Sequence, residues 1–182
     1  MSDADSDAVA VVLDYLPHGR ADDDRPQYQK PALAHALGVE DFRLLECVLA
    51  EGAEVGIGDR IDIRGDAVEE VRTVDHDDIS GGARSELEYA VESIVDENER
   101  RFVDHYNEAQ PITLRLHQLN LLPGIGKKLR NAILEERKRQ PFESFEDLEE
   151  RVAGLHDPKG VLVERIMEEL RDDDLKYRSF VQ

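Results

Sequence analysis

The sequence has a single cysteine and no long apolar run, and each absence excludes a class of protein. In a chain of 182 residues, Cys47 alone can form neither an internal disulfide nor a cysteine-ligated zinc site. No segment approaches the ~18 apolar residues that a membrane helix requires. The opening residues MSDADSDAVA lack the basic start and apolar core of a signal peptide. We therefore expect a cytoplasmic protein without a membrane contact.

Patterns that would hold a metal or carry out catalysis are also missing. The six histidines are scattered, without metal-ligand spacing, at positions 18, 35, 76, 105, 117 and 156. There is no phosphate-binding P-loop, no GxSxG nucleophile motif and no HxxxH pattern. We expect no metal, no cofactor and no enzymatic activity. A metal-dependent nuclease is the alternative, because its carboxylates would be hidden among the many acidic residues.

Lysine is scarce, and the chain is strongly acidic. Its 42 acidic side chains outnumber 23 basic ones, which gives a net charge of −19, and only six of the basic residues are lysine. A small domain needs a net charge of only about 2–8 for solubility. We interpret the excess as adaptation to high salt, where ions screen self-repulsion and carboxylates hold water and cations. The alternative is an ordinary acidic protein that avoids nucleic acid or binds a basic partner.

The charge is distributed unevenly along the chain. Residues 1–109 carry ten basic and 28 acidic side chains, whereas residues 110–182 carry 13 and 14. Within the second part, the stretch KKLRNAILEERKR at 127–139 has a net charge of +4. Such a basic island indicates either an anionic partner or a set of internal salt bridges.

The first part of the chain predicts about five short strands separated by turns. Apolar or alternating runs indicate these strands at 8–16, 31–38, 41–49, 60–64 and 67–75. Too few residues remain for a two-layer sandwich, so we predict a small OB-like barrel, a fold that often binds single strands. Arg20 and Arg25 are basic candidates there, together with Arg60 and Arg64. The alternative is a structural barrel, or one that binds a protein partner through its acidic surface.

Helical spacing replaces the strand pattern from about residue 83. Residues 83–109 predict one helix, or two joined near Asp96, with Ser85 as a candidate N-cap. Further helices are predicted over 112–122 and 127–139. Another begins after Ser144, which forms a capping-box pattern with Asp147, and the last runs from 158 to about 170.

The run Pro123-Gly124-Ile125-Gly126 lies between two predicted helices and resembles the helix-hairpin-helix family. Glycines at 124 and 126 can adopt positive φ and let another backbone approach closely. Ile125 can fill the space between the helices. The amides that come after the glycines then point outward at a helix N-terminus, which favours a phosphate group.

Basic and polar side chains come after the glycines on the outward face of the second helix. Lys127, Asn131 and Lys138 share one face, opposite the apolar residues Leu129, Ala132 and Ile133. The predicted nucleic-acid-binding residues are Pro123, Gly124, Ile125, Gly126, Lys127, Lys128, Arg130 and Asn131, with Arg115, His117, Lys138, Arg20 and Arg25 as further candidates. The alternative is a plain helical hairpin that associates with a protein.

Residues 142–171 resemble a second, degenerate copy of the hairpin that supports the fold, because the Gly–apolar–Gly spacing is absent. We therefore predict an α+β fold. An N-terminal small OB-like β-barrel (1–82) is followed by a helical connector (83–110), a C-terminal all-α tandem helix-hairpin-helix domain (111–171) and a loose tail (172–182).

Several strings together resemble one archaeal family of uncharacterised proteins, domain of unknown function 655. These are LDYLPHGR at 13–20, FV at 102–103, QPIT at 110–113, RLHQL at 115–119 and the run 122–128. Members are described as predicted RNA- or nucleotide-binding proteins, so the resemblance implies nucleic-acid binding, RNA over DNA, in translation or ribosome-related work. We expect a monomer. The alternative function is a protein–protein adaptor in a translation or transcription assembly.

Overall fold

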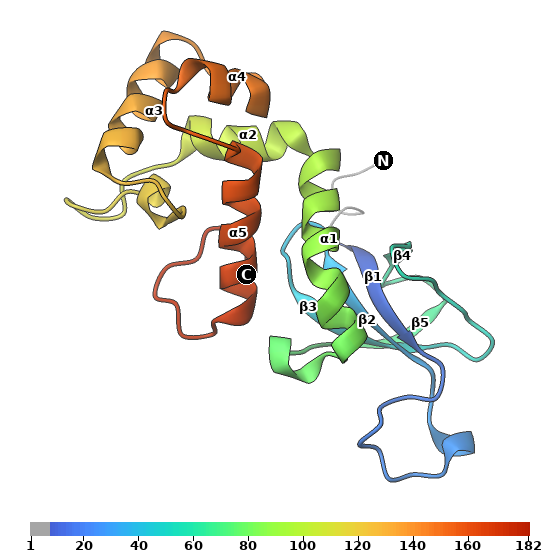
Figure 1. Cartoon of the computed structure of the whole chain (residues 1–182). Coiled ribbons are helices and arrows are strands. Elements are labelled where there is room, and N and C mark those ends of the chain that lie inside the picture. The colour runs from blue at the N-terminus through green and yellow to red at the C-terminus, as the bar shows by residue number, and fades with distance from the viewer. Residues whose placement is uncertain (1–7) are drawn as a thin grey trace. The chain divides into compact units, whose positions relative to one another are not determined.

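The structure, a computed structural model, describes residues 8–182 and divides into two compact units (Figure 1). The first unit extends to Ala90 and includes the three terminal residues Phe180–Gln182, and the second comprises Val91–Ser179. The domain boundaries expected at 82, 110 and 171 stay predictions. No helix within residues 8–182 combines the length and apolar character needed to span a membrane.

The first unit is built on one five-stranded antiparallel sheet, and each strand lies in a range predicted from the sequence. The sheet has the order β4-β1-β2-β3-β5. Its strands are β1 Val9–Leu16, β2 Leu33–Gly38, β3 Leu44–Leu49, β4 Arg60–Asp62 and β5 Val68–Thr73. One face packs around small and medium side chains that include Ala10, Ala34, Ala36 and Cys47. Burial raises the pKa of the Cys47 thiol to about 11.

The predicted fold class was wrong for the β part, because the sheet is a curled half-barrel and not an OB-like barrel. Strands β4 and β5 form its two edges and do not pair with each other. The physical reason lies in β4, where alternation over 60–64 predicted a longer strand. Gly65 donates its N–H to the carbonyl of Asp62 at 2.9 Å, so the chain turns directly after three strand residues. An edge this short leaves little backbone for closing the barrel.

Five helices come after the sheet in the described chain: α1 Gly81–Glu97, α2 Glu99–Glu108, α3 Lys127–Arg139, α4 Phe145–Arg151 and α5 Pro158–Arg171. The break at Asn98, between α1 and α2, lies near the predicted Asp96. Ser80, and not the expected Ser85, caps α1, because Ser80 Oγ accepts the N–H of Ala83 at 3.0 Å. The predicted extent of α3, the Ser144 cap of α4 and the start of α5 at Pro158 are confirmed, and the structure shows that Asp157 caps α5.

The predicted fold class was also wrong for the helical part, which is not an all-α tandem helix-hairpin-helix domain. The helix expected over 112–122 is replaced by a loop, closed by a β-bridge between Pro111 and His117, and by the four-residue 3-10 turn η4, Gln118–Leu121. Thr113 Oγ accepts the N–H groups of Arg115 and Leu116, at 3.2 and 3.0 Å. Such local bonding of a threonine competes with helix formation.

The C-terminal residues were expected to be a loose tail, and this prediction was wrong. In the second unit, the Ser179 N–H donates to the carboxylate of Glu169, which is fully buried, at 3.0 and 3.1 Å. In the first unit, Phe180 is buried and the Gln182 N–H donates to the carbonyl of Asp41. The tail is therefore tied down by backbone hydrogen bonds that its polar sequence did not indicate.

Candidate functional site

The glycine turn, residues 123–126, connects η4 to α3 and has an exposed backbone. Gly124 has φ +80°, a left-handed conformation that favours glycine, whereas Gly126 has φ −91°, which any residue adopts. The expectation of positive φ was thus correct only for Gly124. A Cβ placed on either glycine would meet no atom within 4 Å. Ile125, between them, is buried and anchors the turn.

The first turn of α3 leaves donors available to a ligand. Gly126 is the N-cap and supplies no side-chain acceptor, and the first turn holds no acidic residue. The first four N–H groups of a helix have no partner within it. Here the first helical bond is donated by Arg130 to the carbonyl of Gly126 at 3.0 Å. The amides of 126–129 and the positive end of the helix dipole therefore lie beside the open space around the glycines.

Asn120 holds the glycine turn in place, and it was not among the residues predicted for the site. Its Oδ1 accepts from the His117 N–H at 3.2 Å and from Arg130 Nη1 at 3.1 Å. Its Nδ2 donates to the carbonyl of Ile125 at 3.3 Å. One side chain thus joins the start of η4, the glycine turn and α3. The only signal in the sequence was an asparagine three residues after His117, the spacing of a capping box.

His117 has an internal role. Its side chain is 5% exposed, and Nδ1 accepts the N–H of Leu119 at 3.0 Å, which caps η4. Burial, together with the nearby Arg137 and Arg130, lowers the pKa of His117 below its usual range. The lowered pKa agrees with Nδ1 acting as an acceptor. This ring nitrogen is therefore occupied within the protein, where it stabilises the turn that leads to the glycines.

The basic island divides into internal and outward-facing residues. Arg137 is internal, because its Nη1 donates to the carbonyls of Tyr106 and Ala109 at 3.1 and 2.9 Å. In contrast, Lys127, Lys128 and Lys138 are exposed. Among residues 8–182, no ion pair involves any of these three lysines. Asn131 and Arg115 are likewise exposed, whereas Arg130 is half-buried through its bond to Asn120.

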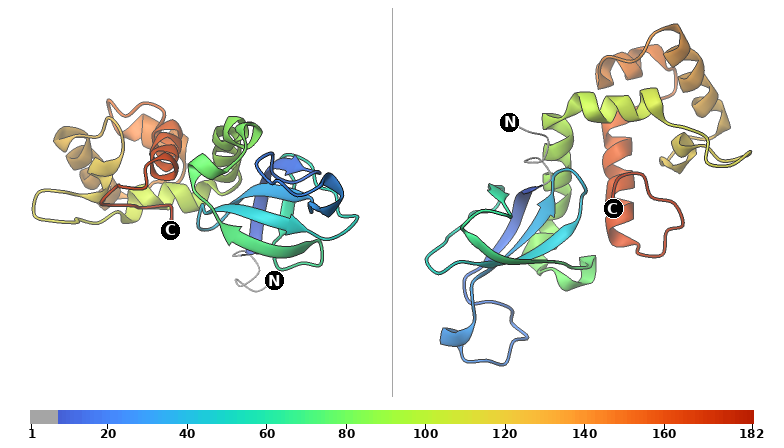
Figure 2. Two further views of the ribbon diagram at one scale, coloured as in Figure 1. Left: turned by 90° about the horizontal axis from the view of Figure 1, so that it is seen from below. Right: turned by 180° about the vertical axis from the view of Figure 1, so that it is seen from behind.

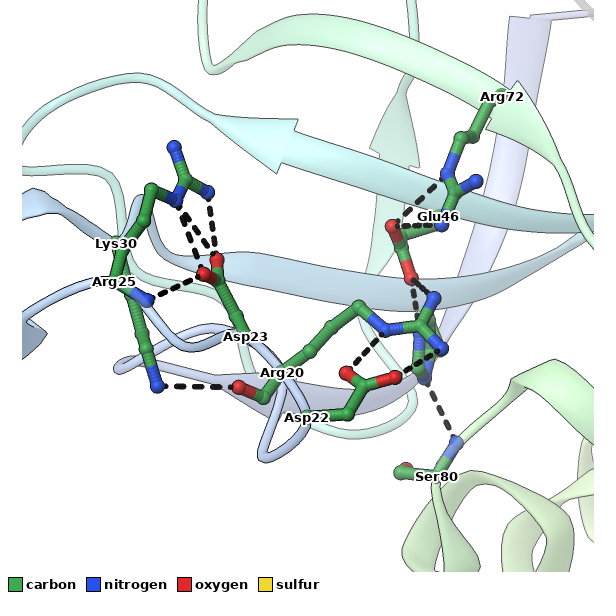
Figure 3. A network of polar contacts seen from close by, with 9 residues as sticks. Arg20, Asp22, Asp23, Arg25, Lys30, Glu46, Arg72 and Ser80 are labelled. Atoms are coloured by element: carbon green, nitrogen blue, oxygen red, sulfur yellow. Dashed lines mark hydrogen bonds and ion pairs between the residues drawn. The ribbon is translucent and has the colours of Figure 1, made fainter.

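The two arginine candidates of the first unit are paired with carboxylates (Figure 3). Arg25 Nη2 lies 2.6 Å from Asp23 Oδ2. Arg20 contacts both Asp22 and Glu46, each at 3.0 Å. These contacts neutralise both guanidinium groups, so the arginines are less suited to a phosphate than the unpaired lysines.

Glu46 is the centre of a buried polar network that crosses the sheet. Its carboxylate, with a side chain 6% exposed, accepts from Arg72 at 2.8 Å and from His35 Nε2 at 3.0 Å. His35 Nδ1 in turn accepts the Ser80 N–H at 3.0 Å, and Ser80 Oγ donates to Asp14 at 2.6 Å. Because the serine hydroxyl bonds to Asp14 and not to the imidazole, this is not the geometry of a hydrolytic triad. The network instead joins the start of α1 to the sheet.

Changing Glu46 to glutamine will destabilise the chain by about 2 kcal/mol at neutral pH, since hydrogen bonds to a charged group are worth about 1.5–3 kcal/mol. Burial alone would raise the pKa of Glu46, but bonds from His35 and Arg72 lower it below its usual value. The contribution of Glu46 to the free energy of unfolding is therefore complete above the ordinary glutamate pKa of about 4.3. It is lost as the pH falls through the lower pKa that Glu46 has in the folded chain. Urea unfolding at pH 7 and in acid will measure it.

The matched control for this variant is Glu69→Gln, which makes the same exchange at an exposed position of β5. The control is expected to leave the free energy of unfolding unchanged at both pH values. Equal losses in the two variants would mean that net charge, and not the Glu46 network, causes the effect.

Within residues 8–182, no group of three or more His, Cys, Asp or Glu side chains is arranged to hold a metal ion. The glycine turn and the outward lysines of α3 form the candidate site.

Comparison with known proteins identifies relatives along the whole length. The model of a family described as a protein of unknown function, DUF655, matches residues 6–182. The uncharacterized protein MJ0038 of Methanocaldococcus jannaschii is 40% identical over 179 residues, which cover 95% of this chain and 79% of that protein. The crystal structure of Af1531 from Archaeoglobus fulgidus, titled as a DUF655 family member, superimposes with a TM-score of 0.87 at 40% identity, covering 96% of this chain and 99% of that one.

Proposed function

The chain belongs to the DUF655 family, whose function is unknown, and we propose that it is a non-catalytic nucleic-acid-binding protein that holds the phosphate backbone at residues 124–128. The observation that supports this most directly is the open N-terminus of α3. Two glycines, at which an added Cβ would meet no atom within 4 Å, lie beside backbone donors and two exposed lysines. A phosphate oxygen is the acceptor that such a helix start favours.

The charge around the turn supports an anionic partner over a basic one. Residues 109–134 contain no aspartate or glutamate, although the chain has 42 of them. The same segment holds Arg115, Lys127, Lys128 and Arg130. An acid-free stretch of this length keeps repulsion of phosphate low. The preference for RNA over DNA, and a role in translation or ribosome-related work, come from the family resemblance alone.

The experiment is a fluorescence-anisotropy titration of the full chain with labelled structured RNA and duplex DNA at several KCl concentrations. We expect saturable binding that weakens as salt rises, because phosphate contacts release counterions. Absence of binding to both probes at every salt concentration would overturn the proposal and favour the protein–protein adaptor. Gel analysis of the same samples with Mg²⁺ will reveal cleavage if the protein is a nuclease.

A further inference from the structure

The 111–117 loop displays an apolar side chain at its tip. Leu114 has a relative exposure of 106%, the largest of any bulky apolar residue among residues 8–182. Its neighbour Arg115 is also exposed. The loop therefore exposes a leucine and an arginine side by side.

Hydrogen bonds fix the shape of this loop. The N–H groups of Ile112 and Thr113 both donate to the carbonyl of Leu116, at 2.7 and 3.0 Å. Thr113 Oγ accepts from the two residues on the far side of Leu114, and the bridge between Pro111 and His117 closes the base. The exposure of Leu114 is therefore built into the turn.

The loop and the glycine turn form one continuous structure. The Gln118 N–H donates to the carbonyl of Gln110 at 3.0 Å, and Gln118 Oε1 accepts the N–H of Gln110 at 2.7 Å. Asn120 then links His117, at the base of the loop, to Ile125 in the glycine turn. Figures 1 and 2 show the loop projecting from the end of the second unit that holds η4 and the start of α3.

We propose that Leu114 packs against an unpaired base of the bound nucleic acid while Arg115 contacts a neighbouring phosphate. This inference rests on the proposed function and names the target more closely: a nucleic acid that offers a bulged, looped or terminal base. The segment 109–134 has basic but no acidic side chains, which favours an anionic occupant. A purely ionic ligand would leave Leu114 in water, whereas a base next to a phosphate covers both side chains.

The glycine turn and Leu114 have different roles in the proposed binding. The glycine turn contacts phosphate in any nucleic acid, because backbone amides do not read the bases. Leu114 needs an accessible base face, which a fully stacked duplex does not offer. Selectivity for an unpaired base therefore comes from the loop, and general affinity from the turn.

The test compares two RNA hairpins that differ by one bulged nucleotide, with 2-aminopurine as the bulged base. The wild-type chain is expected to bind the bulged hairpin about tenfold more tightly than the paired one, the order of the gain from burying one leucine side chain. Its binding should also change the 2-aminopurine fluorescence. In Leu114→Asn, the ratio of the two affinities should fall close to one. The change in 2-aminopurine fluorescence on binding should be largely lost.

Ile57→Asn is the matched control, because Ile57 is an exposed apolar residue of the first unit with 55% relative exposure. It should retain the wild-type affinity ratio. A wild-type chain that binds both hairpins equally, or a Leu114→Asn chain that keeps the ratio, would overturn the inference and leave the proposed function standing. Failure of the wild-type chain to bind either hairpin would overturn both. Thermal melting will establish that the variants are folded.

Discussion

Gly126→Val will abolish nucleic-acid binding while the chain stays folded. At φ −91° a valine fits the backbone, and its Cβ would meet no atom of the protein within 4 Å. The branched side chain would instead fill the space that a phosphate needs to reach the amides at the start of α3. We expect an affinity loss of at least ~100-fold, equal to about 2.7 kcal/mol, in anisotropy titrations at molar KCl.

The substitution is made at Gly126 and not at Gly124, so that a loss of binding can be assigned to the blocked amides. Valine at Gly124 would be strained at φ +80°, so a loss of binding there would follow from a distorted fold. Valine is also a poorer N-cap than glycine, and we expect Gly126→Val to lower stability by about 1 kcal/mol. Unfolding curves will show whether the folded population at the assay temperature is unchanged.

Gly81→Val provides the matched control for Gly126→Val. Gly81 is the first residue of α1, and a Cβ there also meets nothing within 4 Å. The control makes the same exchange in open space at the start of another helix. It should keep wild-type affinity, and a comparable loss in both variants would show that the effect is not specific to the glycine turn.

The double variant Lys127→Ala with Lys128→Ala will weaken binding strongly at low salt and only slightly at molar KCl. Each phosphate contact contributes about 0.7–0.9 to the slope of log affinity against log salt concentration, so losing two contacts flattens the slope by ~1.4–1.8. In concentrated salt, counterion release contributes little to the binding affinity. Directed backbone amides should then contribute more of the affinity than the lysines do.

Titrations across KCl concentrations will rank the affinities of Gly126→Val and the double lysine variant. At molar KCl, Gly126→Val should bind more weakly than the double lysine variant, and the reverse order would contradict the role given to the backbone amides. The control Lys30→Ala with Lys176→Ala removes the same number of charges elsewhere in the chain. It should leave the salt slope unchanged if the lysines act by local contact.

Features that depend on neighbouring residues in the sequence were predicted well. Alternation and apolar runs indicated the five strands, and a helical period with a preceding glycine predicted α3 over its full extent. Gly124 comes shortly before that helix, and Lys127 and Lys128 are exposed in its first turn. Backbone conformation and side-chain phasing depend on local sterics, which is why a short window is enough.

Other predictions were wrong because a specific contact outweighed the local sequence pattern. The apolar spacing of 112–122 favoured a helix, but Thr113 Oγ bonds to the backbone and a bridge to Pro111 closes the loop. The alternation after Arg60 favoured a long strand, but the turn at Gly65 ends β4 early and leaves the sheet open. In the candidate site, the role of Asn120 had only its capping-box spacing after His117 as a sequence signal.

The sequence by itself determined the placement of the strands, the glycine turn and the basic start of α3, since these depend on backbone freedom, residue period and local charge. Only the tertiary structure decided which polar side chains are used internally. Arg137 bonds to carbonyls that come before it by about thirty residues, and Arg20 pairs with Glu46 across a turn and a strand. Such pairings join residues far apart in the chain, and burial then makes them costly to break. Lys127, Lys128 and Lys138 remain outward and form no ion pair within residues 8–182.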